Sequence, residues 1–381
     1  MDVTVVVVGA GLAGLSAAWE LRQAAPGGEV VVLESERRAG GVVLTERHDG
    51  FIVEGGPDGF LAAESDIQEL ARDLGIGDRL VDQLAHGSML WNGTALTPLA
   101  EGQAAALLGI EGHADVGAGH ALPLRHVGFR SFAGGMADIV EALLARLGPA
   151  VRTAMGVTGI APSRRGYRLT LTGGSVVEAE GVILALSAWA AARYIAALGV
   201  MAARGLDAVI YSPSVTVSLA YQRDRIRERL DGTGFVAAGE SATPVRACTY
   251  AWLKYPHRAP EGFALLRAFV GPVDGDPAAL AHAELAQILG VTGSPLWTRA
   301  FHWARGLPRY KPGHAERVAA VRDSLTRLAP LEVAGAGFDG AGVSACVKSG
   351  REAARRVLER VGINPGAPPR GQPSRRESLR G

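Results

Sequence analysis

The stretch that decides the fold is VTVVVVGAGLAG, residues 3–14. A valine-rich strand runs directly into a GxGxxG loop, and an apolar helical segment follows. The first glycine of such a loop allows the tight turn, the second lets the backbone approach a pyrophosphate, and the third lets helix and strand pack closely. A second strand, Val30–Leu33, ends on Glu34, where a carboxylate can accept hydrogen bonds from both ribose hydroxyls. This order of elements predicts a dinucleotide-binding βαβ unit.

The segment after this strand indicates which dinucleotide binds. Residues 34–41, ESERRAGG, fit the pattern ExxxRxGG, which resembles the FAD-binding signature of the flavin-containing amine oxidase superfamily. Arg38 supplies a fork of donors suited to phosphate, and Gly40-Gly41 lets the backbone pass close to the flavin side of the cofactor. FAD is therefore the expected cofactor.

Composition excludes several other classes of protein. The chain has 381 residues, 48% of them apolar and 20% charged, which suits a globular protein of two domains. A net charge of +1 gives no electrostatic case for a nucleic-acid partner. Cys248 and Cys346 are too few and too far apart for a disulfide framework or a zinc site, and they suit a reducing compartment. We therefore expect a cytoplasmic protein with no metal site, and peripheral contact with a membrane stays open as an alternative.

Periodicity changes in the second half of the chain. From residue 212, Val215, Val217, Leu219 and Tyr221 alternate with small residues, which is typical of a strand with one buried face. Further strand candidates, separated by Gly and Pro turns, are 235–236, 245–252 and 263–270. A strand at 331–335, a glycine-rich turn and a helix at 343–361 close the chain and offer backbone N–H groups to an anionic ring system.

The predicted fold class is α/β, with a Rossmann-type FAD-binding domain and a discontinuous antiparallel-sheet substrate domain. The domains are expected to alternate along the chain, with a disordered tail rich in Pro, Gly, Ser and Arg at its end. The expected boundaries are 1–84, 131–210 and 326–364 for the FAD-binding domain, 85–130 and 211–325 for the substrate domain, and 365–381 for the tail.

Several segments together resemble the porphyrinogen oxidase family of haem biosynthesis. Residues 50–61, GFIVEGGPDGFL, are similar to that family's strand and turn beside the flavin ring. The most specific matches are 232–236 (GTGFV), 247–250 (ACTY) and 254–262 (KYPHRAPEG), together with Trp303, 307–314 and the closing turn at 334–343.

The resemblance implies an activity and a set of cofactor contacts. The activity is FAD-dependent oxidation of coproporphyrinogen III or protoporphyrinogen IX by oxygen to the porphyrin; no catalytic residue is singled out. By chemistry alone, Arg125, Arg130 and Arg246 are candidates to bind the propionates of a tetrapyrrole. The implied FAD contacts are Gly9, Ala10, Gly11, Leu12, Ala13 and Gly14 at the pyrophosphate, Glu34 with Ser35 at the ribose, Arg38 and Gly41 on the phosphate-to-flavin side, Gly56, Pro57 and Asp58 near the flavin ring, Val157 beside the adenine, and Trp303, Gly342, Val343 and Ser344 against the isoalloxazine.

The chain also departs from the family. A long, largely helical segment shapes the tetrapyrrole pocket and carries the membrane-facing surface there, whereas only Pro98–Arg130 fills that place here. Two alternatives therefore stay open. One is a flavin oxidase or desaturase of the same superfamily with a different, smaller substrate. The other is a non-catalytic flavoprotein, or a subunit whose protein partner replaces the missing lid.

Overall fold

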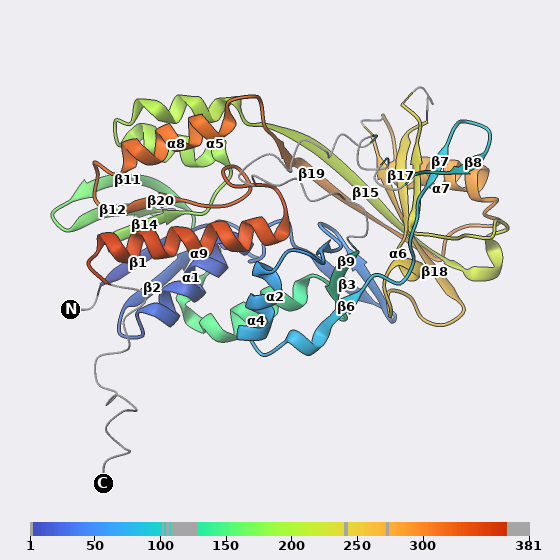
Figure 1. Ribbon diagram of the computed structural model, residues 1–381, viewed down its shortest axis with the longest axis horizontal. Helices are drawn as coiled ribbons and strands as arrows, with labels where there is room; N and C mark the ends of the chain where they lie inside the picture. Colours follow the sequence, from blue (N-terminus) through green and yellow to red (C-terminus); the bar gives the residue numbers. More distant parts are fainter. Residues whose placement is uncertain are drawn as a thin grey trace, which may run out of the picture.

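The computed structural model describes residues 3–100, 103, 107, 128–239, 243–271 and 274–363. The molecule has two lobes, with a parallel sheet and its helices at one end and an antiparallel sheet at the other (Figure 1). Two long strands, β15 (Ile210–Gln222) and β19 (Trp297–Arg309), run from one lobe to the other.

The first lobe is built on a five-stranded parallel sheet in the order β10-β2-β1-β14-β20. Its strands read as nearly continuous valine, isoleucine and leucine because both faces are covered. Helices α1 (Leu12–Ala24) and α9 (Val343–Arg360) pack on one face, and α5 (Ala188–Ala197) and α8 (His314–Leu325) on the other (Figure 1). The strands are β1 (Thr4–Val8), β2 (Glu29–Leu33), β10 (Val151–Arg152), β14 (Gly181–Leu184) and β20 (Leu331–Val333).

Smaller elements complete this lobe and reach toward the second. Helices α2 (Asp66–Asp73) and α4 (Ala137–Leu147) extend the core under α1. The other small elements are the sheet β11 (Val157–Ser163), β12 (Gly166–Leu171) and β13 (Val176–Ala179), the hairpin β3 (Thr45–His48) and β4 (Phe51–Glu54), and the sheet β5 (Phe60–Leu61), β9 (Phe129–Phe132) and β6 (Leu80–Asp82).

The second lobe holds a seven-stranded sheet in the order β19-β15-β18-β17-β16-β7-β8. One face packs on α7 (Pro277–Leu289), which begins where Asp276 accepts a hydrogen bond from the Ala278 N–H. The other face packs on the β3–β4 hairpin and therefore looks toward the first lobe. The remaining strands are β18 (Phe263–Val270), β17 (Val245–Tyr250), β16 (Gly234–Ala237), β7 (Met89–Trp91) and β8 (Leu96–Pro98), and α6 (Ala251–Lys254) follows β17.

The expected fold class is confirmed, and so are the strands expected at 212–221, 235–236 and 263–270. The strand expected at 245–252 ends earlier, because the chain turns into α6 at Ala251. Strand β19 was not expected at all. The predictions for the disordered tail and for most of the short segment after Pro98 lie outside the described residues.

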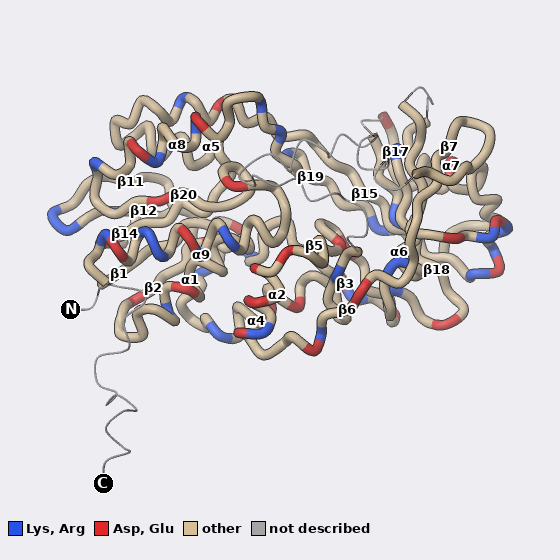
Figure 2. Tube along the Cα trace, viewed as in Figure 1, with Lys and Arg blue, Asp and Glu red and all other residues tan. Residues whose placement is uncertain are grey.

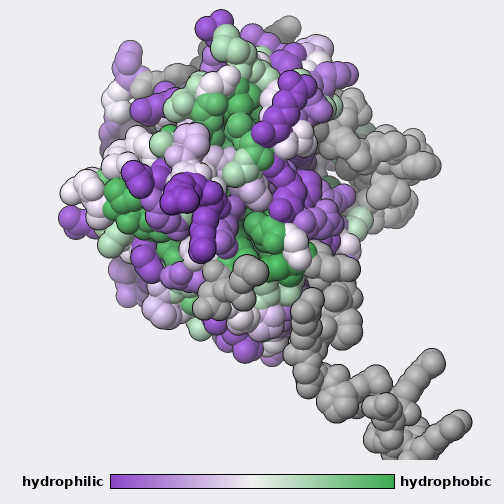
Figure 3. Space-filling view, turned by 90° about the vertical axis from the view of Figure 1, so that its left-hand side faces the viewer, coloured by the Kyte–Doolittle hydropathy of each residue, from purple (hydrophilic) through white to green (hydrophobic). Residues whose placement is uncertain are grey.

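The surface of the described residues carries no strongly one-sided charge. Acidic and basic residues are interspersed over both lobes (Figure 2), and the end of the first lobe shows apolar residues in separate groups between polar ones (Figure 3). Within the described ranges, none of the helices combines the length and the apolar character needed to span a bilayer.

Candidate cofactor site

The glycine loop between β1 and α1 is shaped by two close contacts and one opening. A Cβ on Gly9 would lie 2.4 Å from the Ala185 oxygen, and one on Gly14 would lie 1.9 Å from the Gly9 oxygen. A Cβ on Gly11 would meet nothing within 4 Å among the described residues. The first and third glycines therefore serve packing, whereas the second leaves open space at the N-terminus of α1, where a phosphate can accept hydrogen bonds from free N–H groups.

Glu34 lies at the end of β2 and connects it to the glycine loop. One carboxylate oxygen accepts a hydrogen bond from the Ala10 N–H (2.8 Å), and the other accepts from the Glu36 N–H (2.9 Å) and the Ser35 hydroxyl (3.2 Å). The residue is only 9% exposed. Because a carboxylate has about four lone-pair positions, this arrangement leaves capacity for a ribose hydroxyl.

Arg38 holds the turn that follows. Its guanidinium donates to the carbonyls of Ala39 and Val43, each at 2.9 Å, and also to that of Gly41. Burial lowers the pKa of Arg38, although Glu34 and Glu36 act in the opposite direction. The turn places Gly40 on the loop, where its N–H donates to the Ala10 oxygen at 2.7 Å. The Arg38 guanidinium therefore stabilises the backbone of the turn, and the donors used for these bonds are not available to a cofactor phosphate.

A cavity of about 750 Å³ opens beside these elements. This volume is within the usual range for cofactor and ligand pockets. Val42, an apolar residue in its wall, is 45% exposed. The wall combines first-lobe residues with one aromatic side chain from the second lobe: Glu34, Ser35, Glu36, Arg37, Arg38, Gly41, Val42, Ala154 and Trp303. The cavity has the Glu34 carboxylate, the Gly41 backbone and the Trp303 ring in its wall. This combination of groups fits an elongated dinucleotide such as FAD.

The turn after β4 forms the junction between this cavity and the second sheet. The Trp303 indole N–H donates to the Gly55 oxygen at 2.7 Å, and the Arg267 guanidinium donates to the Gly56 oxygen at 2.6 Å. A Cβ on Gly56 would lie 1.7 Å from the Val42 oxygen, so the turn is pressed against the cavity wall.

Asp58 in the same turn forms an ion pair with Lys254 at 2.8 Å. Burial alone would raise the pKa of the Asp58 carboxyl, but the attraction of Lys254 and Arg267 outweighs burial, so the pKa lies below its usual value. Asp58 is therefore an ionised anchor of the turn rather than a proton donor.

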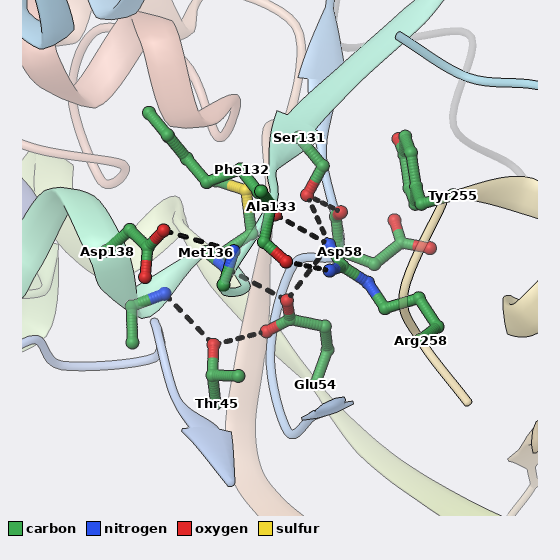
Figure 4. Close-up of polar contacts among 12 residues, drawn as sticks. Thr45, Glu54, Asp58, Ser131, Phe132, Ala133, Met136, Asp138, Tyr255 and Arg258 are labelled. Carbon is green, nitrogen blue, oxygen red and sulfur yellow. Dashed lines mark hydrogen bonds and ion pairs between the residues drawn. The ribbon is translucent and has the colours of Figure 1, made fainter. Parts of the chain in front are cut away.

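A buried network holds the turn from the other side (Figure 4). Arg258 donates to the Ser131 hydroxyl at 2.7 Å and lies 3.6 Å from the Glu54 carboxylate. The Ser131 hydroxyl in turn donates to the Asp58 backbone oxygen at 2.8 Å. Burial raises the pKa of Glu54, opposed by the charge of Arg258 and by hydrogen bonds from Thr45 and Met136.

The closing turn of the chain returns to the opening loop. A Cβ on Gly350 of α9 would lie 2.1 Å from the Ala13 oxygen, so α9 and α1 are in close backbone contact. Gly342 precedes the first turn of α9, and the buried Ser344 hydroxyl accepts from the Ile67 N–H at 3.3 Å. The expected isoalloxazine contacts Gly342, Val343 and Ser344 do not belong to the lining of the described cavity.

The remaining predicted residues that the structure describes are not part of the lining of this cavity. Val157 begins β11, and its carbonyl accepts from the Tyr194 hydroxyl at 2.6 Å. Arg130 already donates to Asp82 and Gln68. Arg246 is exposed on β17, and Arg125 lies outside the described residues. In the described part of the chain, no three His, Cys, Asp or Glu residues come together in a way that could hold a metal ion.

Sequence reasoning missed the cations around the turn: Lys254, Arg258 and Arg267. Each is about 200 positions from Gly56, so only the fold brings them together. One signal was available for Arg267, because it interrupts an otherwise apolar strand, FALLRAFV. A charge in a buried strand needs a reason in the structure.

Comparison with known proteins shows that two family profiles match this chain. The sequence profile of flavin-containing amine oxidoreductases matches residues 78–358, and that of NAD(P)-binding Rossmann-like domains matches residues 7–74. Two curated relatives, both named coproporphyrinogen III oxidase, extend over nearly the whole chain. The protein from Bacillus subtilis is 24% identical, with 93% of this chain and 97% of the relative covered; that from Propionibacterium freudenreichii is 26% identical, with 98% and 94% covered.

Solved structures share the fold. A protein from Exiguobacterium, provisionally named protoporphyrinogen oxidase, has a TM-score of 0.80 at 23% identity, with 94% of this chain and 99% of that chain covered. Putrescine oxidase bound to putrescine has a TM-score of 0.72 at 18% identity, with 94% and 100% covered.

Proposed function

The chain belongs to the family of flavin-containing amine oxidoreductases, and on that premise we propose that it oxidises a porphyrinogen to the porphyrin in haem biosynthesis. The cofactor is FAD, as the family implies, and oxygen is the proposed acceptor. Coproporphyrinogen III and protoporphyrinogen IX are the two substrates that we propose. The observation that carries this proposal is similarity over nearly the full length to curated relatives named coproporphyrinogen III oxidase.

The residues around the cavity would hold FAD in an extended arrangement. The N–H groups of the loop 9–14 would bind the pyrophosphate, Glu34 and Ser35 the ribose, and the cavity wall at Gly41 and Trp303 the flavin side. When bound, FAD would supply the two-electron redox chemistry for oxidation of the porphyrinogen, with oxygen as the final acceptor. The chain's own residues would orient the flavin ring and exclude water from it. Neither role requires a charged catalytic triad.

We place the substrate on the face of the second sheet that looks toward the first lobe. This face supplies Trp303 to the cavity, so a substrate lying on it would meet the flavin end of the site. Arg246, exposed on β17, is the described arginine that we propose for a propionate. Arg130 is a weaker proposal, because Asp82 and Gln68 already take its donors.

A second candidate is a flavin oxidase with a smaller substrate. The alignment with the Bacillus subtilis relative has 460 positions, which exceeds the 381 residues of this chain, so the relative contains segments that this chain lacks. Loss of part of a lid would favour a smaller substrate, a membrane surface or a protein partner that covers the site. Both candidates keep the same cofactor site and differ only in what lies above it.

Aerobic turnover separates these candidates. Protein saturated with FAD is supplied with coproporphyrinogen III or protoporphyrinogen IX, and porphyrin fluorescence and hydrogen peroxide are recorded together. The proposal predicts porphyrin and peroxide with at least one substrate, at a rate above the spontaneous oxidation measured with heat-inactivated protein. A rate equal to that background with both substrates, while the flavin remains bound, would exclude the porphyrinogen assignment and leave the smaller substrate.

A further inference from the structure

Three cations surround the turn 55–58, but among the described residues only two of them form an ion pair with a carboxylate. Lys254 forms an ion pair with Asp58 at 2.8 Å, and Arg258 lies 3.6 Å from Glu54. Arg267 makes no ion pair within 4 Å in the described part of the chain. Its hydrogen-bonded partner is the Gly56 oxygen, a neutral main-chain carbonyl. The cluster around the turn therefore holds three cations against two carboxylates.

Arg267 is also buried. It is 6% exposed, and its Nε–H has no hydrogen-bond partner among the described residues. Its guanidinium lies 5.0 Å from the centre of the Phe269 ring, a contact that stabilises a cation without neutralising it. Burial lowers the pKa of Arg267, and the charges of Asp58 and Glu54 oppose this effect; an arginine starts so high that it stays protonated at neutral pH. A buried charge without a direct ion pair costs folding free energy, which is the pattern expected of a functional group rather than of a structural one.

Arg267 is joined to the cofactor cavity by two successive contacts. Its guanidinium holds the Gly56 oxygen at 2.6 Å, and the Gly56 backbone rests on Val42, which lines the cavity. The neighbouring carbonyl, that of Gly55, is held by Trp303, which lines the same cavity. Consecutive carbonyls of the turn are thus fixed by donors from two strands of the second sheet, β18 and β19.

We propose that Arg267 is a positioning residue for FAD, which fixes the turn 55–58 against the cofactor and holds a positive charge beside it that raises the flavin's reduction potential. Reduction adds negative charge to the ring system, and a fixed cation in a site from which water is excluded stabilises that charge. This inference rests on the proposed position of FAD and is independent of which substrate is oxidised.

The test measures the reduction potential of bound FAD by equilibration with a reference dye. Arg267→Gln removes the charge but keeps a donor for the Gly56 oxygen, whereas Arg267→Lys keeps the charge but loses the planar fork. We expect Arg267→Gln to shift the two-electron reduction equilibrium against the dye at least tenfold toward oxidised flavin, which corresponds to about 30 mV. Arg267→Lys should stay near the wild-type potential and bind FAD more weakly.

Arg299→Met is the matched control. Arg299 and Arg267 both pair with Ser218 in the sheet register, on either side of β15, but Arg299 is exposed and bonded to Glu46 at 2.7 Å. Solvent screens an exposed charge, so Arg299→Met should leave the potential unchanged. Asp58→Asn provides a reciprocal test, since removing a negative charge from the same cluster should raise the potential.

The outcomes separate a charge effect from a purely structural one. Opposite shifts in Arg267→Gln and Asp58→Asn support the proposal. A folded, FAD-saturated Arg267→Gln with the wild-type potential would overturn it, and should that variant not fold, an unchanged or lower potential in Asp58→Asn would do the same. An unchanged potential alongside normal porphyrin formation would reject this inference and leave the proposed function intact.

Discussion

Trp303 and Gly55, 248 positions apart in the chain, are joined by a hydrogen bond of 2.7 Å from the indole N–H to the carbonyl oxygen. The bond connects β19 of the second sheet with the turn after β4 in the first lobe. Because Trp303 also lines the cavity, the residue that joins the two lobes contacts the space proposed for the cofactor. Cofactor binding and the stability of this junction should therefore be coupled.

Trp303→Phe tests this coupling. The substitution keeps an aromatic wall but leaves the Gly55 oxygen without its donor, which should cost about 1–3 kcal/mol of unfolding free energy and weaken FAD binding. Urea unfolding with and without FAD measures both effects. Trp189→Phe is the control, because Trp189 is partly exposed and stacks with Arg305 at 4.1 Å; it should lose less than about 1 kcal/mol. Equal losses in the two variants would contradict the coupling.

Alanine substitutions at Gly11 and Gly14 should have different effects, one on FAD binding and the other on the stability of the apoprotein. Gly11→Ala places a methyl group in open space, so the apoprotein should stay as stable as the wild type while FAD binding is lost. Gly14→Ala would bring a methyl group to 1.9 Å from the Gly9 oxygen, so it should destabilise the apoprotein itself. Thermal unfolding of the apoproteins and FAD titration distinguish the two. A Gly11→Ala variant that binds FAD with wild-type affinity would contradict the proposed place of the pyrophosphate.

Glu34→Gln tests the ribose end. The Glu34 carboxylate accepts from one backbone N–H at each oxygen, so a glutamine in its place must point its NH₂ group at one of these N–H donors and loses that hydrogen bond. The glutamine also lacks the negative charge that strengthens a hydrogen bond from a ribose hydroxyl. We expect the Kd for FAD to rise at least tenfold, about 1.4 kcal/mol. Glu29→Gln, at the exposed start of the same strand, should bind FAD normally. Isothermal titration compares them, and similar affinities in both variants would argue against a role for Glu34.

The closing turn predicts a dependence of stability on pH. Arg322 holds the Asp339 carboxylate by two hydrogen bonds, at 2.8 and 2.7 Å. Burial would raise the pKa of Asp339, but these bonds and the charge of Arg322 outweigh it and lower the pKa. A carboxyl with a lowered pKa in the folded state stabilises the protein above its ordinary pKa of about 4, and this contribution is lost as the pH falls through the folded value.

Asp339→Asn should therefore be less stable at neutral pH by about 1–3 kcal/mol, and its loss of stability below about pH 4 should be smaller than that of the wild type. Chemical unfolding from pH 3 to 7 measures both slopes. Parallel pH profiles for wild type and variant would show that Asp339 does not contribute in this way.

Local patterns were sufficient to predict the βαβ unit that opens the first lobe. The valine strand, the GxGxxG loop and Glu34 lie within one short segment, and their geometry follows from neighbours in the sequence. Strand β15 was also predicted from a local pattern, but the interpretation of one buried face was wrong. Residues 216–221 are all buried, because one face of the sheet packs on α7 and the other packs toward the first lobe.

Strand β19 could not be predicted in this way. It contains Gly306 and Pro308, which normally interrupt strands, and several charged residues. Its place at the edge of the sheet explains why these residues are tolerated, because an edge strand has one side without strand partners. The cations around Gly56 were hidden for a different reason. Their role depends on contacts across about 200 positions, which no local pattern records.

The most direct test of the central claim is anaerobic mixing of the FAD-loaded protein with coproporphyrinogen III, and separately with protoporphyrinogen IX, while the flavin absorbance is followed. If the chain is a porphyrinogen oxidase, the oxidised flavin band bleaches with at least one of them and returns when oxygen is admitted. A flavin band that stays unchanged with both substrates, in folded protein saturated with FAD, would contradict the account.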